Sequence, residues 1–408
     1  MKLQSINPHD QSIVGDLDVS TPKDIESAVL RAKDVLGEWR ETAVEQRCEY
    51  VEKLKGLLLD NKEKLAKLIT MEMGKPLEQS RSEIDSEVEF IDFYVKNGPN
   101  FLANETIIKD DKGLYEVTYE PYGVCACICP WNFPLSMVTS GVLPAIIAGN
   151  TVVVKPSEYT SLSQKLVVDL INQTGLPDGV VNIVIGGSEV GKLLVDSSID
   201  LAWFTGSTRT GLDIYRKCGD KFIKALLEMG GSSAGIVMAD ADIENAVENL
   251  YWARFLNCGQ VCTAVKRLFI EKPIFDKFVS QFIERIKKAK IGDPLQTNDI
   301  GPLMNKKQLE TLKEQVKDAI SKGAKVEVGG NVITSDDLKN GNYFESTILT
   351  NINSDMEVML QETFGPVLPI VEFETLEDVV NLANDTEYGL SAEIYTSDLE
   401  KGRKLAKT

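Results

Sequence analysis

The sequence predicts an α/β protein with two doubly wound units and a projecting β-hairpin. Between Gly123 and Glu228, continuous apolar runs of strand character alternate with helical stretches, which is typical of a parallel sheet covered on both faces. A second series of helical patterns follows the glycine pair Gly230-Gly231. The chain has 408 residues, which is too long for one ordinary compact domain and suits two.

The regular elements can be assigned in chain order. From about Thr21 to Asn97 apolar residues recur near helical spacing, with an interruption at Gly74-Lys-Pro76. Leu114–Tyr119 alternates in strand fashion after the turn signal Asp110–Gly113, which predicts a hairpin. Parallel strands are expected at Val124–Cys129, Thr151–Val154, Val180–Ile185, Leu201–Phe204 and Ala225–Leu227, and later helices at Ile243–Phe255, Phe275–Lys290 and Lys306–Lys322.

This pattern also predicts the domain organisation. Residues 1–102 and 123–229 form one domain, residues 103–122 the hairpin, and residues 230–408 a second domain. Ligands of doubly wound sheets bind at the carboxyl ends of the strands, so the first domain is expected to bind a nucleotide.

Composition and charge argue against several classes of protein. The net charge of −18 opposes binding to a phosphate backbone, so no nucleic-acid partner is expected. No apolar run is long enough to cross a membrane, and Met1–Gly15 lacks a signal-peptide core, which favours a cytoplasmic location. Seven cysteines, an odd number, do not indicate a disulfide framework.

Histidine usage restricts the chemistry further. His9 is the only histidine. Ser-His and Cys-His nucleophile pairs need an imidazole, and histidines dominate catalytic zinc sites. Covalent catalysis would therefore need another base, and no metal site is expected.

Cys262 and Glu228 are the candidate nucleophile and base. Gly259 gives backbone freedom before Cys262, and a helix starting after it would lower the thiol pKa. Glu228 closes an apolar strand beside glycines, where partial desolvation would raise the carboxyl pKa. Taken singly, Cys262 could be a small buried hydrophobe and Glu228 a solvated loop residue. Core packing is also the expected role of the alternating Cys125, Cys127 and Cys129.

Three further segments carry groups suited to a dinucleotide or an oxyanion. Phe204–Gly211 is a strand end, a glycine turn and a helix start, which can bind pyrophosphate through backbone N–H groups. Lys155-Pro-Ser-Glu158 follows a strand and offers a donor and an acceptor for ribose hydroxyls. Asn132, in Pro130-Trp-Asn-Phe-Pro134, can direct an amide at a developing oxyanion, although the segment taken alone is better explained as a proline-bounded turn with buried aromatic residues.

Together these segments resemble the aldehyde dehydrogenase superfamily, in order and over nearly the whole chain. The resemblance is to its non-acylating, NAD(P)-dependent members. The matching motifs are Pro130-Trp-Asn-Phe-Pro134, Lys155-Pro-Ser-Glu158, Phe204-Thr-Gly-Ser-Thr208, Leu227-Glu-Met-Gly-Gly231, Gly259-Gln-Val-Cys-Thr263 and Glu362-Thr-Phe-Gly-Pro366. The resemblance implies an aldehyde dehydrogenase-like fold in which residues 1–102 and 123–229 bind NAD, residues 230–408 are catalytic and the hairpin mediates oligomerisation.

The resemblance also implies a mechanism. Cys262 attacks the aldehyde as a thiolate, Asn132 and the Cys262 N–H hold the oxyanion, and hydride transfer leaves a thioester. Glu228 then activates the water that hydrolyses it.

For the cofactor, the resemblance implies that Lys155 and Glu158 contact the adenosine ribose, Ser207 and Trp131 the pyrophosphate, and Glu362 the nicotinamide ribose. Phe364 is expected near the nicotinamide ring. The other expected cofactor-binding residues are Ile128, Pro130, Ser157, Thr205, Gly206, Gly211, Met229 and Gly230. Glu158 favours NAD because a carboxylate repels the 2′-phosphate of NADP, although Lys155 would soften that repulsion and NADP stays open.

The substrate is expected to be a small aldehyde. Glu72-Met-Gly-Lys-Pro76 resembles the succinate-semialdehyde dehydrogenase branch, although Ser140 stands where that branch often has an arginine. The segment Asn257-Cys-Gly-Gln-Val-Cys262 resembles lactaldehyde-type members, so lactaldehyde or glyceraldehyde is the alternative. A CoA-acylating member and a non-catalytic structural relative are rival readings; the presence of Cys262 and Glu228 opposes both.

Family members usually continue past a segment like Tyr388–Tyr395, with a Pro-Phe-Gly-Gly loop and a strand that completes the partner's sheet. Neither is found before Thr408, so a C-terminal tail is expected to be missing from this sequence. With such a tail, a homodimer or homotetramer is expected.

Overall fold

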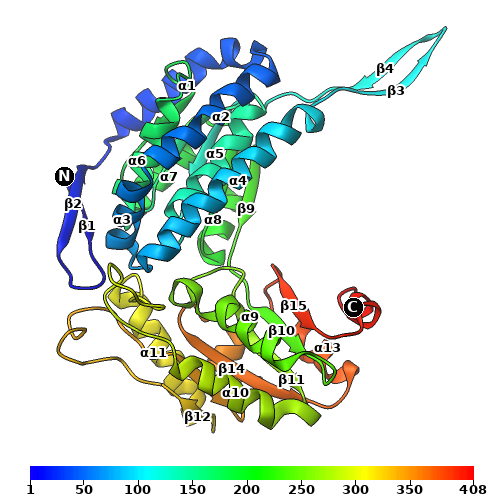
Figure 1. The fold of residues 1–408 in the computed structure, drawn as a ribbon. Coiled ribbons are helices and arrows are strands. Elements are labelled where there is room, and N and C mark those ends of the chain that lie inside the picture. Colours follow the sequence, from blue (N-terminus) through cyan, green and yellow to red (C-terminus); the bar gives the residue numbers. More distant parts are fainter. The chain divides into compact units, whose positions relative to one another are not determined.

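The computed structural model describes residues 1–408 and shows an α/β fold (Figure 1). The chain forms two compact units. Unit 1 consists of Met1–Ile6, Ile13–Glu72 and Ser80–Met229, and unit 2 of Asn7–Ser12, Met73–Gln79 and Gly230–Thr408.

Unit 1 contains a five-stranded parallel sheet with the order β7-β6-β5-β8-β9. Its strands are β5 (Val124–Ile128), β6 (Thr151–Lys155), β7 (Val181–Ile183), β8 (Leu201–Thr205) and β9 (Lys224–Glu228). Every residue of β5 and β6 is buried, as expected of strands covered on both faces. The strand order reverses between β5 and β8, and this switch point is where doubly wound sheets bind ligands.

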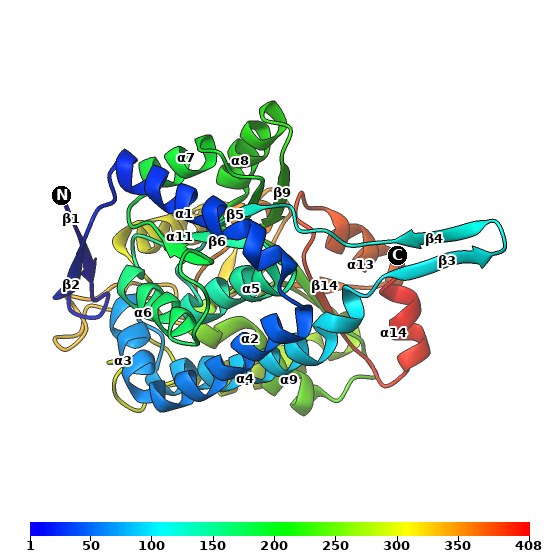
Figure 2. The same ribbon diagram turned by 90° about the horizontal axis from the view of Figure 1, so that it is seen from above.

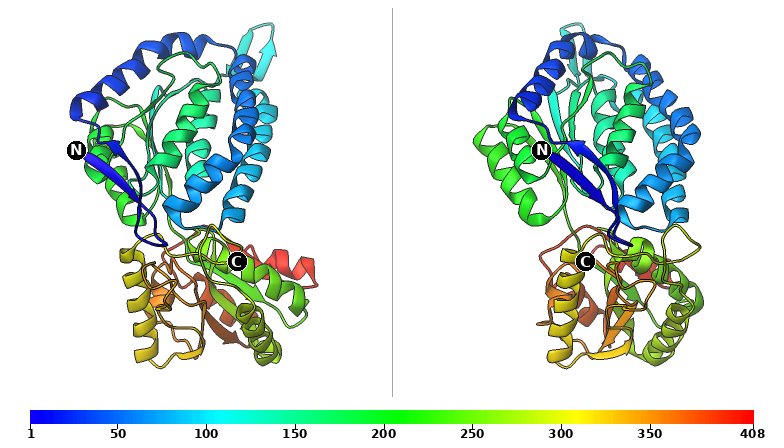
Figure 3. Two further views of the ribbon diagram at one scale, coloured as in Figure 1. Left: turned by 60° about the vertical axis from the view of Figure 1, so that its left-hand side comes forward. Right: turned by 90° about the vertical axis from the view of Figure 1, so that its left-hand side faces the viewer.

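Helices cover both faces of this sheet. One face packs against α1 (Pro22–Glu41), α7 (Ser188–Asp196) and α8 (Thr208–Asp220), which share an apolar core with β5, β6 and β8. The other face packs against α5 (Pro134–Ile147) and α6 (Ser161–Asn172). Outside these lie α2 (Val44–Asp60), α3 (Lys62–Met73) and α4 (Leu77–Phe101), the blue to cyan helices of Figure 3. The helical region predicted at Thr21–Asn97 therefore forms, with its break at Gly74, where φ is +87°.

Two antiparallel hairpins complete unit 1. The first is β1 (Lys2–Ile6) with β2 (Ile13–Asp18), and the second is β3 (Glu105–Asp110) with β4 (Gly113–Val117). The second lies within the predicted hairpin segment and extends away from the rest of unit 1 (Figure 2). Its large apolar side chains are exposed: Ile107, Ile108, Leu114, Tyr115 and Val117.

Unit 2 contains a six-stranded sheet with the order β12-β13-β14-β11-β10-β15. The strands are β10 (Ser233–Val237), β11 (Val265–Glu271), β12 (Lys325–Val328), β13 (Thr347–Thr350), β14 (Val367–Phe373) and β15 (Ala392–Tyr395). All pairings are parallel except that of β12 with β13. The helices are α9 (Ile243–Phe255), α10 (Phe275–Lys287), α11 (Lys306–Ser321), α12 (Glu357–Leu360), α13 (Leu376–Asn384), α14 (Leu399–Leu405), and the 3-10 helices η1 (Leu256–Gly259) and η2 (Lys272–Ile274).

Two short N-terminal segments depart from the predicted division, because Asn7–Ser12 and Met73–Gln79 belong to unit 2. Specific contacts explain this. The His9 Nδ1 atom lies 2.7 Å from the Tyr343 hydroxyl. The Gln79 side chain donates to the Asp299 carbonyl and accepts from the Asn257 N–H. The sequence boundary between Met229 and Gly230 coincides with the division between the units.

Buried carboxylates from α3 and α4 cap two helices of unit 1. Neither α5 nor α6 has a side-chain cap from its own N-cap residue. Glu83 accepts from the N–H groups of Leu135 (2.9 Å) and Ser136 (3.1 Å) at the start of α5. Glu72 accepts from those of Leu162 and Ser163 at the start of α6. Acceptors at these positions satisfy N–H groups that a helix leaves unpaired.

Glu87, one turn beyond Glu83 on α4, predicts a pH dependence of stability. Burial raises the pKa of Glu87 from 4.5 to about 7, with hydrogen bonds from Thr139 and Ser136 acting in the opposite direction. Because the folded-state pKa is raised, the protonated carboxyl stabilises the fold fully below pH 4.5, and this contribution is lost as the pH rises through 7. The loss amounts to at most ~3 kcal/mol.

We therefore expect Glu87→Gln to raise the free energy of unfolding at pH 8 but to change it little at pH 4.5. Glu89→Gln, at an exposed position of the same helix, is the matched control. Urea unfolding at both pH values measures the difference. An equal effect of Glu87→Gln at the two pH values would contradict the assignment.

All seven cysteines are free, and six of them are buried. Cys125 and Cys127 are buried in β5, and the Sγ atoms of Cys127 and Cys129 are 3.6 Å apart. No group of three or more His, Cys, Asp and Glu side chains is arranged to hold a metal ion. None of the helices combines the length and apolar character needed to cross a membrane.

Candidate active site

The carboxyl ends of four parallel strands of unit 1 carry predicted site residues. Ile128 ends β5 and pairs in register with Lys155, which ends β6. Thr205 ends β8 and pairs with Glu228, which ends β9. Parallel register therefore places Lys155, Ile128, Thr205 and Glu228 along one edge of the sheet, across the β5–β8 switch point.

Lys155 and Glu158 form a pair at the β6 end of this edge. The Lys155 ammonium is buried and lies 3.6 Å from a carboxylate oxygen of Glu158. The Glu158 side chain is 36% exposed. Burial lowers the pKa of Lys155, and Glu158 and Cys129 oppose that shift. The pair thus presents one donor and one acceptor at the strand end.

Gln164, on α6, fixes two predicted segments relative to each other. Its side-chain oxygen accepts from the Ser157 N–H (2.7 Å), and its side-chain nitrogen donates to the Pro130 carbonyl (2.9 Å). The loop after β6 and the loop after β5 are therefore joined by one buried amide. The sequence reasoning did not single out this residue, since an isolated glutamine in a helix carries no motif.

The turn between β8 and α8 carries Ser207, one of the two residues predicted to contact the pyrophosphate. Ser207 is the N-cap of α8, and its hydroxyl accepts from the Thr210 N–H. The Gly206 N–H donates to the Glu228 carbonyl at 3.0 Å. An added Cβ would meet the Phe204 ring at Gly206 and the Met229 sulfur at Gly211, so these side chains pack closely against the two glycines.

These groups match the chemistry of a dinucleotide. A donor–acceptor pair suits ribose hydroxyls, and the start of a helix suits the negatively charged pyrophosphate. Both lie on the switch-point edge of a doubly wound sheet.

Asn132 and Glu228 also belong to unit 1, whereas Cys262 belongs to unit 2. Asn132 lies between β5 and α5, the helix whose start Glu83 caps. Glu228 is exposed, so the partial desolvation expected from the sequence is not found. The reason is that β9 is an edge strand, and Lys224, Leu226 and Glu228 share its exposed face.

In unit 2, a strained turn leads into Cys262. Asn257 (φ +53°), Cys258 (φ +57°) and Gly259 (φ +74°) are three consecutive left-handed residues. A Cβ on Gly259 would overlap the Gly365 carbonyl, so only glycine fits there. The Gln260 side chain donates to the Asn257 carbonyl and accepts from the Met304 N–H. Left-handed backbone of this kind persists where surrounding contacts over-determine it.

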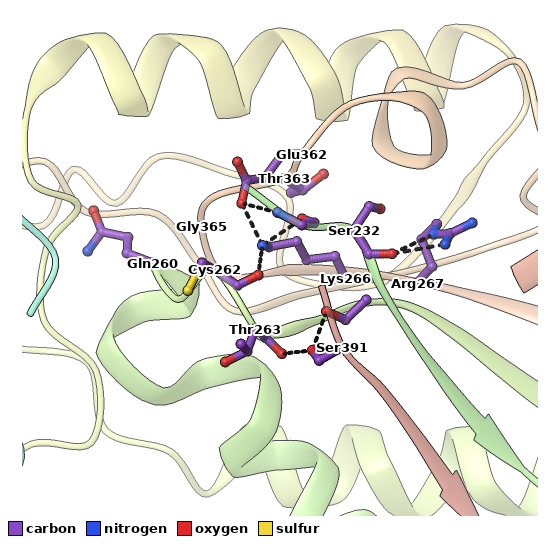
Figure 4. A network of polar contacts seen from close by, with 12 residues as sticks. Ser232, Gln260, Cys262, Thr263, Lys266, Arg267, Glu362, Thr363, Gly365 and Ser391 are labelled. Atoms are coloured by element: carbon purple, nitrogen blue, oxygen red, sulfur yellow. Dashed lines mark hydrogen bonds and ion pairs between the residues drawn. The ribbon is translucent and has the colours of Figure 1, made fainter. Parts of the chain in front are cut away.

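Lys266 connects the residues around the thiol, as Figure 4 shows. Its ammonium donates to the carbonyls of Gly231 and Cys262, both at 2.8 Å, and forms an ion pair of 2.7 Å with Glu362. It also lies 5.5 Å from the centre of the Phe364 ring. Cys262, Glu362 and Phe364, three predicted site residues, are thus brought together.

The sequence prediction about the thiol was wrong in one respect. No helix starts after Cys262; a turn leads directly into β11. Burial raises the pKa of the Cys262 thiol above its ordinary value, whereas Lys266 and the Thr263 N–H act to lower it and Glu362 acts to raise it further. A buried cation and a backbone N–H therefore take the place of the expected helix dipole.

Glycines allow Glu362 to approach the main chain. A Cβ on Gly230 would overlap the Glu362 carboxylate, and the Gly231 N–H donates to that carboxylate at 3.3 Å. On the other side, Arg254 donates to the carbonyls of Thr363 and Gly365. The segment Glu362–Pro366 is therefore fixed against the turn that precedes Cys262.

The aldehyde dehydrogenase family model matches residues 1–408. The chain belongs to the aldehyde dehydrogenase family. The predicted family and fold are thus confirmed, and the chain is an NAD(P)-dependent oxidoreductase of the aldehyde dehydrogenase type.

Curated aldehyde dehydrogenases match nearly the whole chain. Betaine aldehyde dehydrogenase of Bacillus subtilis (strain 168) is 36% identical over 98% of this chain and 83% of its own length. D-glyceraldehyde dehydrogenase (NADP(+)) of Thermoplasma acidophilum is 34% identical over 96% of this chain and 80% of its own. A probable succinate-semialdehyde dehydrogenase [NADP(+)] of Sinorhizobium fredii is 34% identical over 98% of this chain and 82% of its own.

Solved structures support the same assignment. An E. coli NADP-dependent enzyme is 33% identical and superposes with a TM-score of 0.96, covering 100% of this chain and 84% of that one. A 3,6-anhydro-L-galactose dehydrogenase in complex with NAP superposes with a TM-score of 0.95 at 33% identity, covering 100% of this chain and 86% of that one.

Besides Gln164, the sequence reasoning missed two residues of unit 2 of this aldehyde dehydrogenase, Lys266 and Arg254. Lys266 and Arg267 interrupt an otherwise apolar strand, Val265–Ile270, and this was the available signal. Charged residues are almost never fully buried unless they are paired, so two adjacent ones in a core strand indicate specific partners. Arg254, at the end of an amphipathic helix, gave no comparable signal.

Proposed function

We propose that this aldehyde dehydrogenase oxidises a small aldehyde to a carboxylic acid through a thioester on Cys262. The observation that carries the proposal is the half-buried Cys262 thiol, whose pKa responds to the charges of Lys266 and Glu362. The buried Lys266 ammonium binds the Cys262 carbonyl and pairs with Glu362. The other six cysteines are buried, so Cys262 is the thiol suited to meet a substrate.

In the proposed reaction, the Cys262 thiolate forms a bond to the aldehyde carbon, and the carbonyl electron pair moves to oxygen. The Asn132 amide and the Cys262 N–H stabilise that oxyanion. When the oxyanion electron pair re-forms the carbonyl, the carbon–hydrogen bond breaks and a thioester remains on Cys262; bound NAD(P)+ would accept the hydride. Glu228 takes a proton from water, which attacks the resulting thioester and releases the acid with the free thiol.

The cofactor residues are proposed from the two separate groups described above. In unit 1, Lys155 and Glu158 would bind the adenosine ribose, and Ser207 with Trp131 would contact the pyrophosphate. In unit 2, Glu362 and Phe364 would bind the nicotinamide ribose and ring. The remaining proposed contacts are Ile128, Pro130, Ser157, Thr205, Gly206, Gly211, Met229 and Gly230.

The choice between NAD and NADP is proposed to depend on Glu158. Its carboxylate is partly neutralised by Lys155 at 3.6 Å, which reduces but does not remove its repulsion of a 2′-phosphate. We expect NAD to be preferred and Glu158→Gln to raise kcat/KM for NADP by about tenfold, a change of ~1.4 kcal/mol. Kinetics with both cofactors measure this. Glu189→Gln, at an exposed position of α7, is the control. An unchanged NADP preference would contradict the role of Glu158.

A semialdehyde such as succinate semialdehyde is the proposed substrate. The support is the Glu72–Pro76 motif and the S. fredii relative named for that activity. A small hydroxyaldehyde is the second candidate, because the T. acidophilum relative is named for glyceraldehyde and the segment before Cys262 resembles lactaldehyde-type members.

The test is the formation of NADH or NADPH from succinate semialdehyde, lactaldehyde, glyceraldehyde, betaine aldehyde and a simple aliphatic aldehyde. The highest kcat/KM with succinate semialdehyde supports the first choice, and the highest with lactaldehyde or glyceraldehyde supports the second. Product formation that requires CoA would indicate an acylating enzyme instead. Cofactor binding without turnover of any aldehyde would favour a non-catalytic relative.

We further propose that the β3–β4 hairpin mediates association into a homodimer or homotetramer. Its apolar side chains, including Ile108 and Tyr115, are exposed on both strands. A continuous exposed apolar surface is typical of protein–protein contacts. Sedimentation measures the assembly, and a monomer at micromolar concentration would contradict this proposal.

A further inference from the structure

Lys266 is a buried basic residue to which the proposed reaction assigns no role. It lies on β11 at a register shift, because Ser233 pairs with Val265 whereas the next residue, Ala234, pairs with Arg267. Lys266 is therefore the extra residue of a β-bulge. Bulges of this kind redirect a side chain and are frequent beside active sites. Here the bulge directs the lysine side chain toward the main chain at the thiol.

The ammonium of Lys266 has three donors and three acceptors around it. These are the carbonyls of Gly231 and Cys262 and the Oε1 atom of Glu362, at 2.8, 2.8 and 2.7 Å. The side chain has no exposed surface. Burying an ammonium is costly unless each N–H is paired, so this set of acceptors accounts for a charge at this depth.

These contacts link two segments far apart in the sequence. Cys262 immediately precedes β11, whereas Glu362 and Phe364 precede β14. Lys266 binds the backbone of the first segment and the carboxylate of the second (Figure 4). Its ammonium also lies 5.5 Å from the centre of the Phe364 ring. The Gly231 N–H supplies a second bond to the same carboxylate oxygen.

We infer that Lys266 is a positioning residue for the proposed reaction: it holds the Cys262 backbone and the Glu362 carboxylate in one arrangement and supplies a buried positive charge beside the thiol. The inference rests on the proposed function, because it assigns a purpose to the contacts of the nucleophile and of a cofactor-binding carboxylate. The lysine itself touches no reacting atom.

The charges around the thiol act in opposite directions. Burial disfavours the Cys262 thiolate, the Lys266 ammonium favours it, and the Glu362 carboxylate disfavours it. Removing the Lys266 charge must therefore raise the thiol pKa, and removing the Glu362 charge must lower it. If the Lys266 charge did not act on the thiol, replacing Lys266 with methionine would leave the thiol pKa unchanged.

The experiment measures the pH dependence of Cys262 alkylation by iodoacetamide in the wild type, Lys266→Met and Glu362→Gln. The six buried cysteines leave Cys262 as the accessible thiol, and Cys262→Ala gives the background. We expect Lys266→Met to react about tenfold more slowly at pH 8, which corresponds to one pKa unit. Glu362→Gln should react faster than the wild type. Lys272→Met removes an exposed lysine just after the same strand and should match the wild type.

Binding of NAD+ is the second readout. With Lys266 replaced by methionine, the Glu362 carboxylate loses its 2.7 Å ion pair and keeps only the longer bond from Gly231. We expect the dissociation constant for NAD+, measured by calorimetry, to rise about tenfold in Lys266→Met and to stay unchanged in Lys272→Met.

Circular dichroism establishes whether each variant is folded. If Lys266→Met does not fold, faster alkylation of Glu362→Gln still supports the charge arrangement, and an unchanged rate overturns it. If Lys266→Met folds and its alkylation profile matches the wild type, the inference is wrong. Neither alkylation nor NAD+ binding needs an aldehyde, so a wild-type protein that oxidises none of the aldehydes tested refutes the proposed function separately.

Discussion

Replacing Cys262 with alanine is expected to abolish aldehyde oxidation while leaving NAD+ binding intact. The thiolate forms the bond to the substrate carbon, and alanine offers no atom that can replace it. Lys266 binds the Cys262 carbonyl, and alanine keeps that carbonyl. Steady-state formation of NADH and calorimetric binding of NAD+ measure the two parts of this prediction.

Cys258→Ala is the matched control for this variant. Cys258 is buried four residues before Cys262, and burial raises the pKa of its thiol to about 12. A thiol with such a pKa is protonated at neutral pH and is not a nucleophile. Cys258→Ala should therefore retain turnover. Turnover by Cys262→Ala, or its loss in Cys258→Ala alone, would refute the assignment of the nucleophile.

Replacing Glu228 with glutamine is expected to give a single burst of NADH followed by little steady turnover. Formation of the thioester needs no base at Glu228, whereas its hydrolysis needs one to activate water. The glutamine keeps the size of the side chain but cannot accept the proton. Rapid-mixing measurements give the amplitude of the burst and the steady rate in one experiment.

Lys224→Gln is the control for Glu228→Gln, since Lys224 lies on the same exposed face of β9. It should leave both the burst and the steady rate near those of the wild type. If Glu228→Gln lowered the burst and the steady rate equally, Glu228 would not act mainly in hydrolysis of the thioester.

The fold could be predicted well from local patterns. The apolar runs at Val124–Cys129 and Thr151–Val154 became β5 and β6, because strands buried on both faces need apolar side chains throughout. The break at Gly74 was predictable because its φ of +87° suits glycine. Local patterns could not predict that unit 2 includes Asn7–Ser12 and Met73–Gln79. This attachment depends on contacts with residues hundreds of positions away.

The candidate site could be predicted as a set of residues but not as an arrangement. The resemblance to the aldehyde dehydrogenase superfamily selected Glu362 and Phe364 beside Cys262, and the structure connects these three residues through Lys266. The source of the positive charge beside the Cys262 thiol was predicted wrongly. The sequence indicated the start of a helix, whereas the charge comes from Lys266 on a β-bulge. A bulge is set by strand pairing, which local periodicity does not reveal.

The desolvation predicted for Glu228 failed for a similar reason. The sequence shows that Glu228 ends a strand, but only the strand order shows that β9 lies at the edge of its sheet. One face of β9, the last strand of this sheet, is exposed to solvent, and Glu228 lies on that face together with Leu226.

The covalent thioester on Cys262 is the central claim, and the mass of the Glu228→Gln variant after mixing with NAD+ and aldehyde tests it most directly. Because hydrolysis is blocked, the protein should gain the mass of one acyl group less the thiol hydrogen. After proteolysis, that group should lie on the peptide that contains Cys262, and hydroxylamine should remove it. NADH formed in an amount equal to the protein without any such adduct, or with an adduct on another residue, would contradict the mechanism.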